Sequence, residues 1–340
     1  MKASLDAKET SYTGNSGMME LREAISHHFE QRYGVHYDPK DEILVTVGVS
    51  EGLAMALLAI TEPGDEVIIP DPAYVAYPAS VELAGGTPVF VPTYPEHDFK
   101  LTVEALEKVI TPKTKAIVIG YPNNPTGTVM SAEELMPIAK FAEEHDLIVL
   151  SDEIYCELMY GDAKFTSFAK LPGMRERTVI FNGFSKAYAM TGMRLGYVCA
   201  PREGLAPILK LHQYAIMCAN TTAQVGGITA LKECDDDVEA MRQEYDRRRK
   251  VIYKGLCDMG LPVFEPKGAF YIFPDIRCTG MTSAEFCEKL VQEEKVAVVP
   301  GTAFGDQGEG FVRISYAASM DTIQEALKRM ARFVAKYRKD

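Results

Sequence analysis

The segment Val179–Ala200 reads VIFNGFSKAYAMTGMRLGYVCA and indicates the kind of fold to expect. Two short apolar runs, Val179–Phe181 and Gly196–Ala200, enclose a polar stretch that contains Lys186 and Arg194. Strands that are apolar throughout are typical of a sheet that is covered on both faces. The segment therefore predicts neighbouring buried strands, with polar groups placed where the first of them ends.

Similar runs recur through the first two thirds of the chain and alternate with helix-like stretches. The other strand candidates are Ile43–Val47, Glu66–Ile69, Val89–Val91, Lys115–Ile119 and Leu147–Leu150. The helix candidates are Met18–Tyr33, Glu51–Ile60, Tyr74–Ala84, Val103–Val109 and Glu133–His145, the last with a capping box at Ser131 and Glu134. This alternation predicts an α/β fold, with a mostly parallel seven-stranded sheet covered by helices.

The pattern changes after about Asp235, where a long charged helix, Asp236–Cys257, is expected. Beyond it, strands are predicted at Val263–Phe264, Phe270–Phe273, Val296–Val299 and Val312–Ser315, and helices at Ser283–Glu294 and Ser319–Lys336. We expect a large domain over residues 1–250, with the linking helix, and a smaller α+β C-terminal domain over residues 251–340.

The composition excludes several classes of protein. Hydrophobic residues make up 47% of the 340, which rules out a disordered chain. Thirty-six Lys and Arg against 48 Asp and Glu give a net charge of −12, which argues against nucleic-acid binding. No apolar run is long enough to cross a bilayer, and the seven scattered cysteines favour reduced thiols. We therefore expect a cytoplasmic protein with no membrane contact.

The turn Gly48–Gly52 admits three interpretations. Its sequence, GVSEG, matches the nucleophile elbow of serine hydrolases, but only His212 follows far enough downstream to serve, and it lies in a predicted helix. The commoner interpretation is that Ser50 caps the following helix. In the third, the free backbone N–H groups of the turn bind a phosphate.

Three predicted strands end in specialised polar groups. Asp152 follows Leu147–Leu150, Asn124 lies in a Pro/Asn/Gly turn after another strand, and Lys186 follows Val179–Phe181. Alone, each has an ordinary explanation as a helix cap, a turn or an exposed lysine. Because ligands of open α/β sheets bind at the carboxyl ends of the strands, the three together predict a functional site.

These stretches resemble the pyridoxal-phosphate enzymes of the aspartate aminotransferase fold, class I aminotransferases in particular. The resemblance extends over nearly the whole chain, in the family's order. It is carried by Tyr12–Gly17, Gly48–Gly52, Asn124–Gly127, Asp152–Tyr155, Ser185–Lys186 with Arg194, and Phe311–Ser315. It implies an aminotransferase that moves an amino group between an amino acid and a 2-oxo acid with pyridoxal phosphate as cofactor.

The resemblance also implies roles for individual residues. Lys186 would hold the cofactor as a Schiff base and move the substrate's α-proton as general base and acid. Asp152 would keep the pyridinium nitrogen protonated, and we expect it to remain ionised with a lowered pKa against that cation. Tyr155 and Asn124 would hydrogen-bond the phenolic oxygen of the ring.

The remaining implied contacts concern the phosphate, the ring face and the substrate. The phosphate would be bound by Arg194, Ser185 and the turn of Val49, Ser50 and Glu51, with Tyr74 stacked on the ring. Arg313, together with Asn124, would bind the substrate's α-carboxylate. Tyr12 would reach the phosphate of the neighbouring subunit, which implies a homodimer with shared active sites.

The chain departs from the family pattern at three places. Gly183 stands three residues before the lysine, where a serine is common, and eleven residues precede Tyr12 where the family has several tens. We expect the catalytic residues to be kept and the specificity apparatus to differ. Ser50 occupies the position of a lysine that receives the distal carboxylate in related bacterial aspartate enzymes, which favours a broad or aromatic and aliphatic substrate range.

Two alternatives use the same fold. A pyridoxal-phosphate lyase or decarboxylase would need the same Lys186 and Arg313. A pyridoxal-phosphate-binding module with little activity would also keep the cofactor residues.

Overall fold

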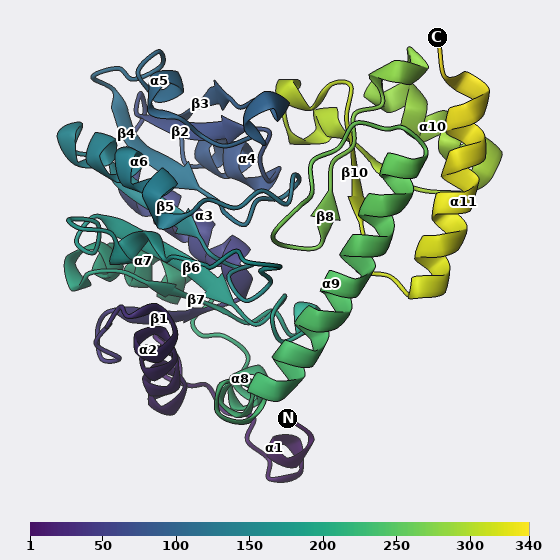
Figure 1. The fold of residues 1–340 in the computed structure, drawn as a ribbon. Coiled ribbons are helices and arrows are strands. Elements are labelled where there is room, and N and C mark those ends of the chain that lie inside the picture. Colours follow the sequence, from purple (N-terminus) through teal and green to yellow (C-terminus); the bar gives the residue numbers. More distant parts are fainter. Residues whose placement is uncertain (340) are drawn as a thin grey trace.

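A seven-stranded sheet forms the centre of the computed structural model, which describes residues 1–339 (Figure 1). Its strands are β1 (Ile43–Thr46), β2 (Glu66–Asp71), β3 (Thr87–Pro92), β4 (Thr114–Ile119), β5 (Ile148–Asp152), β6 (Thr178–Gly183) and β7 (Gly196–Cys199). Their order in space is β1-β7-β6-β5-β4-β2-β3, with β7 antiparallel to both neighbours and the other pairs parallel. The predicted α/β class and mostly parallel sheet are confirmed.

Helices cover both faces of this sheet because both faces of its strands are apolar. On β1, Ile43 and Val45 pack into one core while Leu44 packs into the other. One face carries α3 (Gly48–Ile60), α4 (Ala76–Leu83) and α7 (Arg202–Ala215). The other carries α2 (Met19–Tyr33), α5 (Val103–Leu106), α6 (Ala132–Glu144) and α8 (Thr221–Glu233). The predicted capping box of Ser131 and Glu134 begins α6.

A second, three-stranded antiparallel sheet lies beside the first (Figure 1). It contains β8 (Tyr271–Ile272), β9 (Val299–Pro300) and β10 (Val312–Ser315), with β10 in the middle, and packs with α10 (Ser283–Glu294) and α11 (Met320–Tyr337). The long helix α9 (Asp235–Asp258) runs from α8 to this part of the molecule. The division into two domains stays a prediction, and the boundary predicted between residues 250 and 251 would fall inside α9.

The strand predicted at Val263–Phe264 is wrong. This segment has no regular structure, and Phe264 packs its ring against Phe99 in a small aromatic cluster. Two apolar residues that are partly buried by side-chain packing therefore resemble a short strand in sequence, although the segment is not part of a sheet. The strand predicted at Val296–Val299 is also displaced, because regular pairing begins only at Val299.

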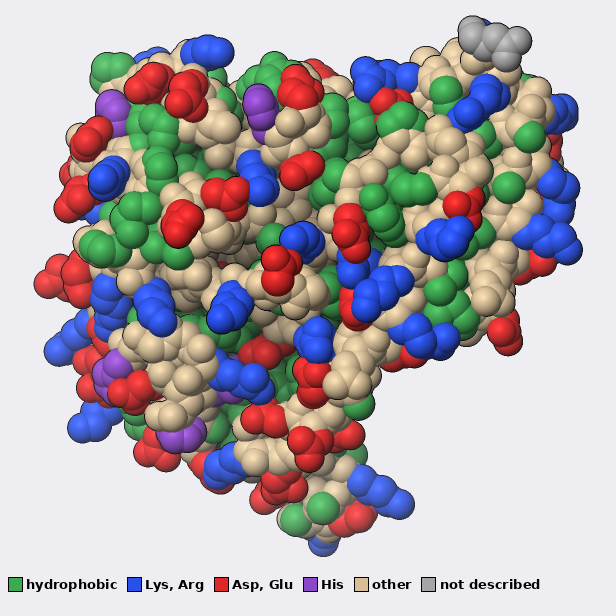
Figure 2. Space-filling model, viewed as in Figure 1, with side chains coloured by type: hydrophobic (Ala, Val, Ile, Leu, Met, Phe, Trp, Pro, Cys, Tyr) green, Lys and Arg blue, Asp and Glu red, His purple; other side chains and the backbone are tan. Residues whose placement is uncertain are grey.

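The N-terminal helix α1 (Lys2–Asp6) was not predicted, and it lies against α8 at one edge of the molecule (Figure 1). Acidic and basic side chains are mixed over the face shown in Figure 2. Within residues 1–339 no helix is both long and apolar enough to span a bilayer, and the seven cysteines form no disulfide.

Candidate active site

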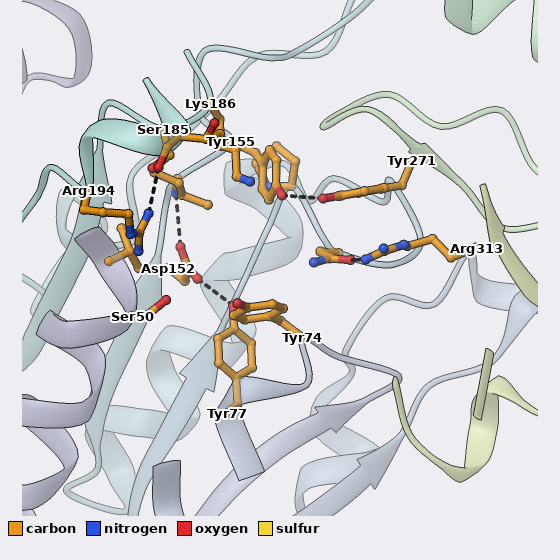
Figure 3. Close-up of a pocket in the computed structure, with 15 residues that line it drawn as sticks. Ser50, Tyr74, Tyr77, Asp152, Tyr155, Ser185, Lys186, Arg194, Tyr271 and Arg313 are labelled. Carbon is orange, nitrogen blue, oxygen red and sulfur yellow. Dashed lines mark hydrogen bonds between the residues drawn. The ribbon is translucent and has the colours of Figure 1, made fainter. Parts of the chain in front are cut away.

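A cavity of about 360 Å³ opens at the carboxyl ends of the central strands and is closed on the other side by the second sheet. Ten residues predicted from the sequence line it: Val49, Ser50, Tyr74, Asn124, Asp152, Tyr155, Ser185, Lys186, Arg194 and Arg313. Figure 3 shows how most of their side chains converge. Two predicted residues, Glu51 and Tyr12, do not line it.

Asp152 is the last residue of the central strand β5, and its carboxylate is buried in the floor of the cavity. One oxygen accepts a hydrogen bond of 2.8 Å from the Tyr77 hydroxyl, and the other accepts one of 3.2 Å from the Ile154 N–H. Burial raises the pKa of Asp152 above its usual value, although these hydrogen bonds and the charge of Lys186 oppose the rise. The pKa of Asp152 is therefore raised in the protein by itself, and not lowered as expected. The expected lowering depends on a cation in contact with the carboxylate.

The Lys186 amine points into the cavity from the loop after β6. It lies 5.7 Å from the ring centre of Tyr155 and 5.6 Å from that of Phe270, and no hydrogen bond holds it within residues 1–339. Burial lowers the pKa of Lys186, and the positive charges of Arg194 and Arg313 lower it further, against the opposing effect of Asp152. A lysine in this environment gives up its proton more readily, as a nucleophile or proton carrier requires.

The start of α3 offers a corner that could bind an anion. Val47 is the N-cap residue, no side chain within residues 1–339 caps this helix, and Val49 and Ser50 of its first turn line the cavity. Arg194 brings its guanidinium alongside, where a Cβ at Gly48 would lie only 2.5 Å from it. Gly48 has a φ of +77° and no side chain, so both the turn and the close approach depend on glycine.

Glu51 and His212 form a buried pair behind this corner. His212 is fully buried, with Nδ1 3.0 Å from one Glu51 oxygen, while the other oxygen accepts a hydrogen bond from the Val47 N–H. Because His212 is paired with Glu51, the serine hydrolase interpretation lacks its base. Ser50 caps nothing in the structure, so the second interpretation of the turn is not supported either.

Gly183 departs from the family pattern for a packing reason. A Cβ there would lie 2.7 Å from the Cα of Gly196 and 2.9 Å from the carbonyl oxygen of Leu195 on the neighbouring strand. A serine would push β6 and β7 apart. One hydroxyl donor to the phosphate is absent, and the close approach of the two strands is what excludes it.

Arg313 reaches the cavity from β10 in the second sheet. One terminal nitrogen donates a hydrogen bond of 2.9 Å to Oδ1 of Asn124, which joins the two sheets across the cavity. Nε of Arg313 is buried and has no hydrogen-bond partner among residues 1–339, and the guanidinium lies over the rings of Tyr271 and Phe304. This planar cation can still donate hydrogen bonds to a carboxylate.

Sequence reasoning missed two residues that contact the predicted ones. Tyr77 binds Asp152, and the hydroxyl of Tyr271 lies 2.9 Å from that of Tyr155. Tyr77 could have been found, since it stands three residues after Tyr74 at the start of a predicted helix and so shares its side. Tyr271 had no such signal, because nothing in the sequence brings its strand to the first sheet.

Comparison with known proteins identifies the family. Residues 1–330 match the family described as aminotransferase class I and II. The chain belongs to this family. The aminotransferase is 50% identical to an aspartate aminotransferase of Pyrococcus abyssi, covering 97% of this chain and 85% of the relative. It is 48% identical to aromatic-amino-acid aminotransferase 2 of Thermococcus litoralis, again covering 97% and 85%.

Solved structures agree with this assignment. The crystal structure of an aromatic aminotransferase from Pyrococcus horikoshii OT3 matches with a TM-score of 0.97 at 49% identity, covering 98% of this chain and 90% of that one. Aspartate aminotransferase from Thermus thermophilus with maleate matches with a TM-score of 0.93 at 39% identity, covering 97% and 86%. The aminotransferase is therefore a pyridoxal-phosphate-dependent enzyme of amino-group transfer.

The cavity fits this cofactor. The N-terminus of α3, Ser185 and Arg194 line one corner of the cavity, where they could together bind a phosphate dianion. The buried Asp152 is suited to bind the protonated ring nitrogen, and the unbonded amine of Lys186 is free to react with an aldehyde. Three cations and one carboxylate in the cavity of a chain of charge −12 also favour anionic ligands.

Proposed function

We propose that this aminotransferase acts on amino acids with aromatic or aliphatic side chains and has no strict preference for aspartate. The observation that carries the proposal is the distribution of positive charge. Within residues 1–339 the cavity is lined by only three cations, Lys186, Arg194 and Arg313. The first two are assigned to the cofactor and Arg313 to the α-carboxylate, so none of the three is left for a second carboxylate.

The walls that remain contain no charged group within residues 1–339. Besides Thr191 they are aromatic or apolar, namely Tyr77, Pro122, Ile154 and Tyr271, and Phe304 lies 4.6 Å from the Arg313 guanidinium. Ser50 stands in the turn where a lysine would receive a distal carboxylate. Apolar contact with the substrate side chain is therefore the main source of binding energy available beyond the α-carboxylate.

Each step of the proposed amino-group transfer can be given to a particular residue of the cavity. When bound, pyridoxal phosphate supplies an electron sink for the charge left on the substrate's Cα after its proton is removed. Lys186 would take that proton and return it to the cofactor carbon that the amino nitrogen joins to Cα, aided by its lowered pKa. Asp152 would keep the ring nitrogen protonated, Tyr155 and Asn124 would bind the phenolic oxygen, and Arg313 would fix the α-carboxylate.

Substrate range can be measured by mixing the holoenzyme with single amino acids and following the visible absorbance of the cofactor. We expect phenylalanine, tyrosine and leucine to react with kcat/KM values equal to or above that of aspartate. The matching 2-oxo acid should form in amounts equal to the amino group transferred. A preference for aspartate of more than about tenfold would contradict the proposed range, and release of CO₂ or ammonia in place of the 2-oxo acid would indicate a decarboxylase or lyase.

We also propose that the enzyme is a cytoplasmic homodimer, with a large domain over residues 1–250 and a small domain over residues 251–340. Tyr12 is 80% exposed and is not among the residues that line the cavity, while its neighbour Ser11 accepts a hydrogen bond from Thr221 on α8. Tyr214, also 80% exposed, and Met217 leave apolar surface at the end of α7. A second subunit would bury these groups, and Tyr12 would then reach the cofactor phosphate bound by that second subunit.

Replacing Tyr12 by Phe should weaken cofactor binding and leave the oligomer unchanged. Loss of one hydrogen bond to the phosphate should cost roughly 0.5–1.5 kcal/mol, and more if the phosphate is fully charged. Cofactor titration measures the first effect and sedimentation the second. Tyr94→Phe, on an exposed tyrosine that is not part of the proposed interface, serves as the control. Unchanged cofactor affinity in Tyr12→Phe, or a stable monomer that holds the cofactor normally, would refute the shared site.

A further inference from the structure

Tyr271 touches both of the groups on which the proposed reaction depends. Its hydroxyl lies 2.9 Å from the hydroxyl of Tyr155, and its ring centre lies 4.5 Å from the guanidinium carbon of Arg313 (Figure 3). Tyr155 belongs to the turn after β5, and Arg313 belongs to β10. Tyr271 thus provides a second contact across the cavity, in addition to the hydrogen bond from Arg313 to Asn124.

The strand register explains the contact with Arg313. In the antiparallel pair of β8 and β10, Tyr271 is directly opposite Ser315. Arg313 stands two residues before Ser315, so it is the diagonal neighbour of Tyr271 on the same face of the sheet. A cation over the face of a tyrosine ring is attracted to it, and Phe304 lies on Arg313 as well, at 4.6 Å. The guanidinium is therefore in contact with two aromatic rings, and its Nε has no hydrogen-bond partner within the described residues 1–339.

The hydrogen bond between the two hydroxyls has a direction once Tyr155 binds the cofactor. A hydroxyl has a single proton, so while the two hydroxyls stay bonded, Tyr155 can donate to the phenolic oxygen only when Tyr271 donates to Tyr155. A hydroxyl that accepts such a bond becomes a stronger donor itself. Burial raises the pKa of both tyrosines, which keeps both protonated and able to donate.

We propose that Tyr271 is a positioning residue with two separable parts. Its hydroxyl strengthens the donor of Tyr155 toward the phenolic oxygen, and its ring supports Arg313 for the α-carboxylate. This inference rests on the proposed roles of Tyr155 and Arg313. If it is correct, a residue of the second sheet affects the basicity of the cofactor as well as the binding of the α-carboxylate.

Tyr271→Phe tests the hydroxyl. The visible absorbance of the holoenzyme, titrated with pH in the absence of substrate, reports the basicity of the group formed between Lys186 and the cofactor. A weaker donor at Tyr155 destabilises the deprotonated phenolic oxygen. The midpoint of the titration should therefore move to higher pH, by about 0.4–1 unit. The affinity for 3-phenylpropionate, a monocarboxylate that would bind Arg313, should change less than twofold.

Tyr271→Leu tests the ring. Loss of the surface under the guanidinium should weaken binding of 3-phenylpropionate and raise KM by about 2–30-fold, in addition to the shift of the titration midpoint. Tyr245→Phe is the control, since Tyr245 packs on Phe270 outside the cavity. It should leave both the titration and the affinity unchanged.

A double-mutant cycle decides whether the hydroxyl acts through Tyr155. Tyr155→Phe alone should shift the midpoint upward, and adding Tyr271→Phe to it should shift it little further. The inference is overturned if Tyr271→Phe titrates like the parent enzyme, or if the two shifts add in full. Failure of the parent to bind pyridoxal phosphate at all would instead refute the proposed function, so the two failures are distinguishable.

Discussion

Replacing Lys186 by Ala is expected to lower turnover by about 10⁴-fold or more while leaving the fold intact. Within residues 1–339 no other lysine lines the cavity, and the chemistry needs one amine that both binds the cofactor's aldehyde carbon and carries a proton. The side chain ends in the cavity without a hydrogen-bond partner, so its loss removes no structural contact beyond the packing of its stem. Turnover and circular dichroism measure the two parts of this prediction.

Two further measurements make the assignment of Lys186 specific. Borohydride reduction of the parent holoenzyme should attach the cofactor covalently to Lys186, as shown by mass spectrometry of the peptides. Lys328→Ala, on the exposed side of α11, should retain full turnover and the same label. Recovery of the label on a different lysine would show that the amine has been assigned wrongly.

Asp152→Ala is expected to retain part of the cofactor and to lose at least about 10²–10³-fold in kcat. Without the carboxylate, the ring nitrogen loses its proton and the electron sink weakens. The variant also deprives the Tyr77 hydroxyl of its acceptor. Steady-state turnover at saturating cofactor measures the effect, and Asp162→Ala, an exposed aspartate bonded only to Lys267, is the control. Turnover near that of the parent would reduce Asp152 to a structural role.

The raised pKa of Asp152 has a consequence for the cofactor-free protein. Because folding raises this pKa, the ionised carboxylate opposes folding at pH values above the folded-state pKa, and the penalty disappears as pH falls below the unfolded-state value. Asp152→Asn should therefore raise the Tm of the apoprotein at pH 8 more than at pH 4. Equal effects at both pH values would show that burial does not govern this carboxylate.

The sequence predicts the first sheet well because its information is local. The apolar runs of the central strands are buried on both faces, so each is recognised as a strand from its own residues. Following these runs to their ends is enough to place Asp152, Asn124 and Lys186. Ends of parallel strands meet at one edge, so three residues far apart in the chain could be predicted to share a site. The structure brings all three to the same cavity.

The second sheet is predicted less well because its strands are only two to four residues long. The apolar side chains of Val263 and Phe264 pack against hydrophobic clusters without belonging to a strand. Sequence periodicity alone does not distinguish such a segment from a strand of a sheet. The contact between Tyr155 and Tyr271 depends on how the second sheet packs against the first. The roles of Glu51 and Gly183 depend on His212 and Gly196, which follow them by 161 and 13 positions.

The course of α9 has a consequence for how enzymes of this shape diversify. Lys186, Asp152 and Arg194 are anchored to one sheet, whereas Arg313 and Tyr271 belong to the other, which the chain reaches along a single helix. Substitutions beyond α9 can alter which substrate is accepted while the ring-binding groups keep their places. Such substitutions meet the α-carboxylate site directly at Arg313, and they reach the ring-binding groups through the contact of Tyr271 with Tyr155.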